Sequence, residues 1–136
     1  MKTQEDIIID FYQNLGKLFY AIAATDKKVH PAEVTKLQEL VEKYWLDVSV
    51  IEDVHYKDGA NKIVLFFQTL NNEGKLSAKT CFKDFVTYKN ENKHLFTDNL
   101  KRLIIKTATE MAHAFSGLNK SELIVLAKLD IELKNI

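Results

Sequence analysis

The sequence predicts an all-α fold, a compact bundle of about six to seven helices built from two pseudo-repeated helical hairpins. Apolar residues recur at three- and four-residue steps along most of the chain. Helix breakers are scarce, because the 136 residues include one proline and four glycines. The connections between the expected helices are short, which favours antiparallel neighbours. The length fits one domain spanning residues 1–136.

The helices expected in the first half follow from this periodicity. A first helix over Gln4–Thr25 carries a single apolar stripe, formed by Ile8, Phe11, Tyr12, Leu15, Leu18, Phe19 and Ile22. A second begins at Pro31, and its inner face is formed by Val34, Leu37, Leu40, Val41 and Tyr44. Residues 46–59 are expected to hold a short helix and a loop. A third helix covers 60–72, with Ile63, Val64, Phe67 and Leu70 inward.

The second half continues the pattern with three more helices, over 78–90, 98–115 and 120–134. The first of these turns Cys81, Phe82, Phe85 and Val86 inward, and the polar run 89–93 is predicted to be a linker. The helix over 98–115 points Leu100, Leu103, Ile104, Thr107, Ala108 and Met111 inward. Residues 7–9 and 63–67 have the composition of buried strands, but each lies inside a longer helical period, so we expect helix there.

Composition argues against several classes of protein. Lys plus Arg and Asp plus Glu are both 19, and this zero net charge is atypical of nucleic-acid binding. Lys101, Arg102 and Lys106 form a local basic cluster, which we interpret as a solvated helix face. The single cysteine, Cys81, excludes an internal disulfide. No apolar run is long enough to span a bilayer and residues 1–10 do not resemble a signal peptide, so we expect a cytoplasmic protein.

Three helix-to-helix turns share a pattern, at residues 26–33, 73–80 and 115–122. In each, a potential N-cap residue begins the next helix; these residues are His30, Ser77 and Asn119. Glu33 and Glu122 fall at the third helical position, where a carboxylate can accept a hydrogen bond from the amide of the cap residue. We therefore predict a capping box at the first and third joints.

An aliphatic residue precedes each cap, and a second apolar residue follows five positions later. This spacing predicts three hydrophobic staples, which pair Val29 with Val34, Leu76 with Cys81, and Leu118 with Leu123. The first and third joints are 89 residues apart, so an internal duplication of one hairpin is plausible.

The first joint resembles that of tellurite-resistance TerB-like proteins, a family related to a domain of membrane-anchored DnaJ-type cochaperones. Their helix ends Ala-x-x-Asp-Gly-x-hydrophobic-Ser/Thr-x-x-Glu, and residues 23–33 here are Ala-Ala-Thr-Asp-Lys-Lys-Val-His-Pro-Ala-Glu. The resemblance covers about residues 18–40 and 107–129. The chain departs from the pattern at Lys27, at His30, and at Phe115, where the second motif has Asp.

The resemblance implies an all-helical fold and a metal site. Acidic residues of the family have been proposed to bind an ion such as calcium, and the matching positions here are Asp26, Glu33 and Glu122. Ca²⁺ and Mg²⁺ both favour clustered carboxylate oxygens. The spacing is not that of an EF-hand, because Leu37 occupies the twelfth position from Asp26. The alternative interpretation gives both glutamates a purely structural role in the capping boxes.

The sequence shows no recognisable catalytic set. None of its four histidines, His30, His55, His94 and His113, forms the pair around a glutamate that helical zinc proteases use. We therefore expect a protein that is not an enzyme. Two functions remain, a helical scaffold that binds a protein partner in a stress-response assembly, and a divalent-metal sensor. An exposed aromatic patch would mark a surface for a partner or for homodimer formation.

Overall fold

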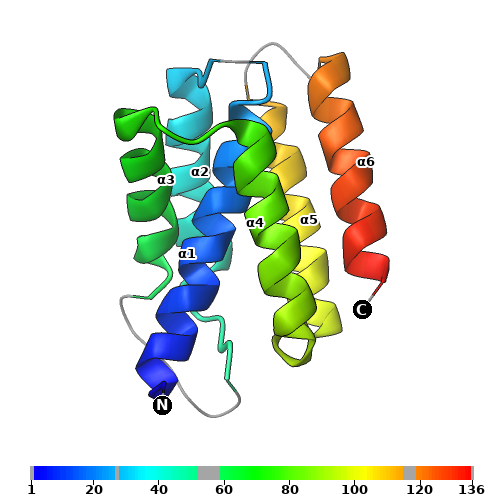
Figure 1. Ribbon diagram of the computed structural model, residues 1–136. Coiled ribbons are helices and arrows are strands. Elements are labelled where there is room, and N and C mark those ends of the chain that lie inside the picture. Colours follow the sequence, from blue (N-terminus) through cyan, green and yellow to red (C-terminus); the bar gives the residue numbers. More distant parts are fainter. Residues whose placement is uncertain (1, 27, 52–58, 115–118, 136) are drawn as a thin grey trace.

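The computed structural model shows an all-α bundle and describes residues 2–26, 28–51, 59–114 and 119–135 (Figure 1). Six α-helices and one short 3-10 helix are present in these ranges. They are α1 (Gln4–Ala23), α2 (Pro31–Tyr44), α3 (Asn61–Glu73), α4 (Ala78–Glu91), η1 (Lys93–Leu95), α5 (Asp98–Ala112) and α6 (Lys120–Lys134). The predicted fold class is therefore confirmed. None of the described helices is long and apolar enough to cross a membrane.

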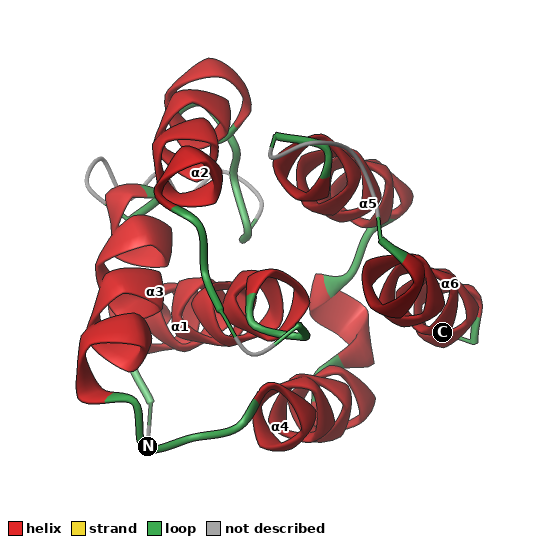
Figure 2. Cartoon of the chain, turned by 90° about the horizontal axis from the view of Figure 1, so that it is seen from above, coloured by secondary structure: helices red, strands yellow, loops and turns green. Residues whose placement is uncertain are grey.

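Helix α1 lies at the centre of the bundle (Figure 2). It contacts α3, α4, α5 and α6, whereas α6 lies at the outer edge. All seven residues of its predicted stripe are buried. Tyr20, Ala21 and Ala23 are buried as well, so the C-terminal half of α1 is covered on nearly every side. Thr3 caps the helix and forms a capping box with Asp6.

The predicted helix boundaries agree with the structure to within three residues. Helix α1 ends at Ala23 rather than Thr25, and α5 ends at Ala112 before a turn, with Phe115 outside the described residues. Helix α3 ends where Gly74 adopts φ +64°, a conformation that favours glycine. Residues 46–51 form no helix, and 52–58 lie outside the described residues. Both candidate strand segments lie inside helices, so the strand alternative is wrong.

The predicted linker at residues 89–93 is wrong at its first residues. Helix α4 continues to Glu91, and the side chain of Lys89 is only 1% exposed. Its Nζ donates to the carboxylate of Glu132 on α6 at 2.9 Å and to the Glu132 carbonyl at 3.0 Å. The apolar stem of a lysine can be buried while its ammonium reaches such a partner. The polar composition of this run therefore indicated a linker where the structure has a buried turn of helix.

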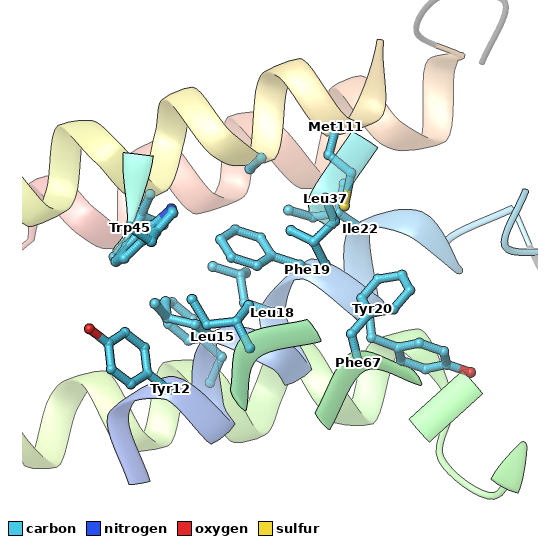
Figure 3. Packing of buried hydrophobic residues seen from close by; sticks show 14 of the residues in the cluster. Tyr12, Leu15, Leu18, Phe19, Tyr20, Ile22, Leu37, Trp45, Phe67 and Met111 are labelled. Atoms are coloured by element: carbon cyan, nitrogen blue, oxygen red, sulfur yellow. The ribbon is translucent and has the colours of Figure 1, made fainter. Parts of the chain in front are cut away.

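The core is rich in aromatic side chains that pack between helices (Figure 3). The indole of Trp45 is fully buried, donates from Nε1 to the Thr107 hydroxyl at 2.9 Å, and meets the ring of Tyr12 edge to face. Phe67 is buried against Tyr20. Cys81 is buried, as predicted from its apolar neighbours. Burial between helices therefore explains these aromatic side chains.

The structure confirms the predicted N-cap positions of the three joints, but only some of the residues in the predicted hydrophobic staples pack against the core. Ser77 Oγ accepts from the Thr80 amide at 3.1 Å, and Val29 and Val34 both pack against the core. At the third joint Leu118 lies outside the described residues, and Leu123 is 51% exposed. Leu123 therefore points away from the core, and its predicted staple with Leu118 lies outside the described residues.

Candidate functional site

The first and third joints face one another at one end of the bundle. Both precede a helix that begins at the upper end in Figure 1, α2 after the first joint and α6 after the third. Asn119 Nδ2 donates to Asp26 Oδ2 at 3.3 Å, across 93 residues of sequence. His30 Nε2 lies 3.8 Å from the same carboxylate oxygen. The joints are thus in direct polar contact.

Each joint uses its glutamate as the predicted capping box requires. Glu33 Oε1 accepts from the His30 amide at 3.0 Å, and Glu122 Oε1 accepts from the Asn119 amide at 3.2 Å. Asn119 Oδ1 in turn accepts from the Glu122 amide at 2.8 Å. These contacts satisfy backbone donors that have no partner within the helix and place negative charge at its N-terminus.

The two glutamates also contact each other. Glu33 is 1% exposed and Glu122 is 5% exposed. Glu33 Oε2 is buried and accepts no hydrogen bond from a donor in the described part of the chain. The contact between the two carboxyl groups acts to raise the pKa of Glu33 and to lower that of Glu122, which favours Glu33 as the member of the pair that holds a proton. Two carboxyl groups in contact favour this arrangement, because both cannot ionise without repulsion.

The electrostatics of Glu33 follow from this burial. Desolvation is the main cause that raises the pKa of Glu33, to about 7, and the His30 amide acts in the opposite direction. The nearby charges of Glu122 and Asp26 raise the pKa of Glu33 further. Burial also raises the pKa of the Glu122 carboxyl, and the Asn119 amide opposes that shift. The pair can therefore hold one proton at a contact between two helix N-termini.

The structure brings together the three acids that the TerB-like resemblance implies as metal ligands. Asp26 and Glu33 flank the first joint, and Glu122 reaches them from α6. Within residues 2–26, 28–51, 59–114 and 119–135, no three His, Cys, Asp or Glu side chains are arranged to hold a metal ion. The cluster is instead a pair of carboxyl groups in contact, with Asp26 hydrogen-bonded to Asn119 beside them.

Replacing Glu33 with glutamine is expected to remove most of the pH dependence of stability between pH 4.5 and 7. The pKa of Glu33 is about 7 in the folded protein, against an ordinary value of 4.5. The folded state therefore binds more protons in this window, and stability falls as the pH rises through it, by on the order of 3 kcal/mol. Urea midpoints at pH 5, 6, 7 and 8 measure this slope.

At pH 8 the Glu33→Gln protein should be more stable than the parent, because an amide can donate to Glu122 without carrying charge. Glu39→Gln is the matched control, since this glutamate is exposed on the same helix and should leave the slope unchanged. A parent protein whose urea midpoint is flat from pH 5 to 7 would contradict the shared-proton pair.

A cleft of about 610 Å³ lies between α2 and α5 beside the first joint. Its walls carry charges of both signs, including Lys36, Glu39 and Glu110, and an exposed His113 lies at its edge. His113 is the C-cap residue that follows α5, and its Nδ1 lies 2.9 Å from the Thr109 carbonyl. Mixed charge without a positioned nucleophile gives this cleft no definite chemistry.

The outer face of α6 is a feature that the sequence analysis missed. Helix α6 buries Glu122, Leu129 and Leu133, which share one side. The opposite side carries Leu123, Ile124 and Ile131, which are 51%, 47% and 57% exposed. Positions 123, 127 and 131 are four residues apart and follow one another along a helix, with exposed Ala127 between the larger side chains. We call residues 123, 124, 127 and 131 the α6 stripe.

A signal for the stripe was present in the sequence. Apolar residues occur on every side of α6, whereas a surface helix normally keeps one polar face. The exposed large side chains of α6 are aliphatic rather than aromatic.

Comparison of the chain with protein-family models, with curated proteins and with solved structures finds no match. The features that bear on function are therefore the two joints and the exposed surface of α6.

Proposed function

We propose that this protein is a non-enzymatic interaction module, a helical scaffold that binds a protein partner through the α6 stripe. The observation that carries the proposal is the exposure of Leu123, Ile124 and Ile131 on one face, opposite the buried face of the same helix. Single exposed apolar residues are ordinary, but several large ones on one face are typical of an interaction surface.

The buried polar contacts of α6 support this role. Its N-terminal turn is held to α2 through Glu122 and Glu33, and its C-terminal half is held to α4 through Glu132 and Lys89. A helix fixed near both ends presents its free face in one orientation. Such preorganisation lowers the conformational entropy that binding costs.

The TerB-like resemblance of residues 18–40 and 107–129 agrees with this proposal. TerB-like domains are thought to act as scaffolds in stress-response assemblies, and we extend that role to this chain as a cytoplasmic TerB-like module. The second region of resemblance includes the joint that positions α6 and most of the α6 stripe.

Substitution of serine for both Leu123 and Ile131 should abolish partner binding without unfolding the protein. Both side chains are more than half exposed, so the loss of core packing should be small. The measurement is quantitative affinity capture from native lysate with tagged full-length protein. Leu65→Ser is the matched control, because Leu65 is 49% exposed on α3.

A protein captured by the parent and by the Leu65→Ser variant, but lost with the double variant, is the expected result. Circular dichroism melting of all three proteins checks that they are folded. Equal capture by the parent and the double variant would exclude the α6 stripe as the binding surface.

Divalent-cation binding by Asp26, Glu33 and Glu122 stays a second proposal. It is favoured by the convergence of these acids and by the buried Glu33 Oε2, which accepts no hydrogen bond from a donor in the described ranges. An ion would have to displace the proton shared by the glutamates and the contact from Asn119 to Asp26. Calorimetric titration with calcium and with magnesium tests it, and neither heat nor a melting shift at millimolar ion would reject it.

A further inference from the structure

A groove of about 370 Å³ runs between α5 and α6. Its lining residues come mainly from the N-terminal half of α5 and from the last turn of α6. Ile105 and Leu133 contribute apolar surface to it. Asp130 and Lys134 line its α6 wall and lie within one turn of Ile131, so the groove adjoins the α6 stripe. The groove therefore lies beside the C-terminal end of the α6 stripe.

The charges around the groove are predominantly positive. Four basic side chains line it, Lys101, Arg102, Lys106 and Lys134, against two carboxylates, those of Asp98 and Asp130. Both carboxylates are already paired, Asp98 with Lys101 at 3.2 Å and Asp130 with Lys134 at 2.9 Å.

Arg102 and Lys106 are therefore the cations whose charge no groove carboxylate balances. Arg102 donates to the side-chain oxygen of Asn99, which is neutral. Lys106 Nζ lies 4.5 Å from the centre of the Tyr44 ring, a contact that holds its position and keeps its charge. Because the chain as a whole is neutral, this local excess distinguishes the groove from the average surface.

The charges around the groove favour some binding partners over others. A second copy bound through the same face would bring the basic residues of both copies together, which disfavours a symmetric dimer. A groove with apolar residues and a basic rim beside an apolar stripe suits an amphipathic helix, whose apolar face lies in the groove and whose charged edges meet the rim.

We propose that the partner surface recognised here is an amphipathic helix with an acidic edge. Its apolar face would cover the α6 stripe and the groove, and its carboxylates would pair with Arg102 and Lys106. This proposal rests on the proposed function, since it specifies the chemistry of the partner that the α6 stripe binds.

Two synthetic helical peptides that differ only in their flanking charges test the proposal. Both carry the same leucine face, one with glutamate flanks and the other with lysine flanks, and each is labelled for fluorescence anisotropy with the full-length protein. The acidic peptide should bind at least about tenfold more tightly than the basic one. The double variant Arg102→Glu and Lys106→Glu should lose about that factor for the acidic peptide.

The matched control reverses two lysines on α4, in a Lys79→Glu and Lys83→Glu variant, which carries the same net charge far from the groove. It should change affinity less than about twofold. Equal affinity for both peptides, no binding of the acidic one, or equal losses in both double variants would overturn the proposal. So would a dimer that disappears on Ile131→Ser, or cosedimentation with phosphatidylserine vesicles without peptide binding.

The double variant Leu123→Ser and Ile131→Ser distinguishes failure of this proposal from failure of the proposed function. If the double serine variant binds neither peptide, and reversing the charges of Arg102 and Lys106 has no effect, the proposed function is supported. The proposal of an acidic partner is then rejected. Binding that depends on the charge pair but not on the α6 stripe would reject the proposed function instead.

Discussion

Replacing Gly16 with valine is expected to destabilise the protein by at least about 3 kcal/mol, because α1 and α3 are in contact at this glycine. A Cβ at position 16 would lie 2.9 Å from the Phe66 Cβ and 3.0 Å from the Ile63 carbonyl oxygen. Neither atom belongs to the free end of a flexible side chain. The two helices would have to separate, and the central packing of α1 would be lost with them.

Urea denaturation followed by circular dichroism measures this loss. Gly16→Ala should cost less, because the higher helix propensity of alanine offsets about 1 kcal/mol of the clash. Gly74→Ala is the matched control, since a Cβ there meets nothing within 4 Å and only the positive φ of +64° is unfavourable, a cost of about 1–2 kcal/mol. A Gly16→Val protein as stable as the parent would show that α1 and α3 do not approach so closely.

Replacing Glu132 with alanine should cost about 3 kcal/mol, near the lower end for a broken buried ion pair. Lys89 is 1% exposed, and its ammonium would lose the carboxylate that lies 2.9 Å away. One contact remains, to the Glu132 carbonyl at 3.0 Å, which moderates the effect. The destabilisation comes mainly from the buried charge that is left without a counter-ion.

An exposed pair on the same helix gives the comparison. Asp130 and Lys134 lie 2.9 Å apart at the surface, so Asp130→Ala should cost under about 1 kcal/mol. A double variant with Lys89→Met and Glu132→Leu should recover much of the loss, because it removes both charges together. Equal free energies of unfolding for Glu132→Ala and Asp130→Ala would contradict the burial of Lys89.

The helices could be predicted from sequence because their signals are local. The stripe of α1 repeats within one segment, and the caps at Ser77 and Asn119 depend on residues three positions away. Pro31 at the first position of α2 is likewise a local signal. The convergence of Glu33 and Glu122 was implied only by the TerB-like resemblance, because spacing within the sequence could not establish it.

The remaining features depend on tertiary contacts. Lys89 lies in a polar run, and only its contact with Glu132 on another helix explains its burial. Leu123 occupies a staple position by spacing, yet the packing of α6 turns it outward. The groove between α5 and α6 is formed by residues about 30 positions apart, so no pattern within one helix could predict it.

The interaction role of α6 is tested most directly by a photo-crosslinking residue placed at Ala127, the exposed small residue within the α6 stripe. In intact cells we expect one discrete heteromeric adduct from position 127, and none from the same residue at Lys79 on α4. The adduct should disappear when Leu123 and Ile131 are both serine. No adduct at 127, or the same adducts from both positions, would contradict the proposed function.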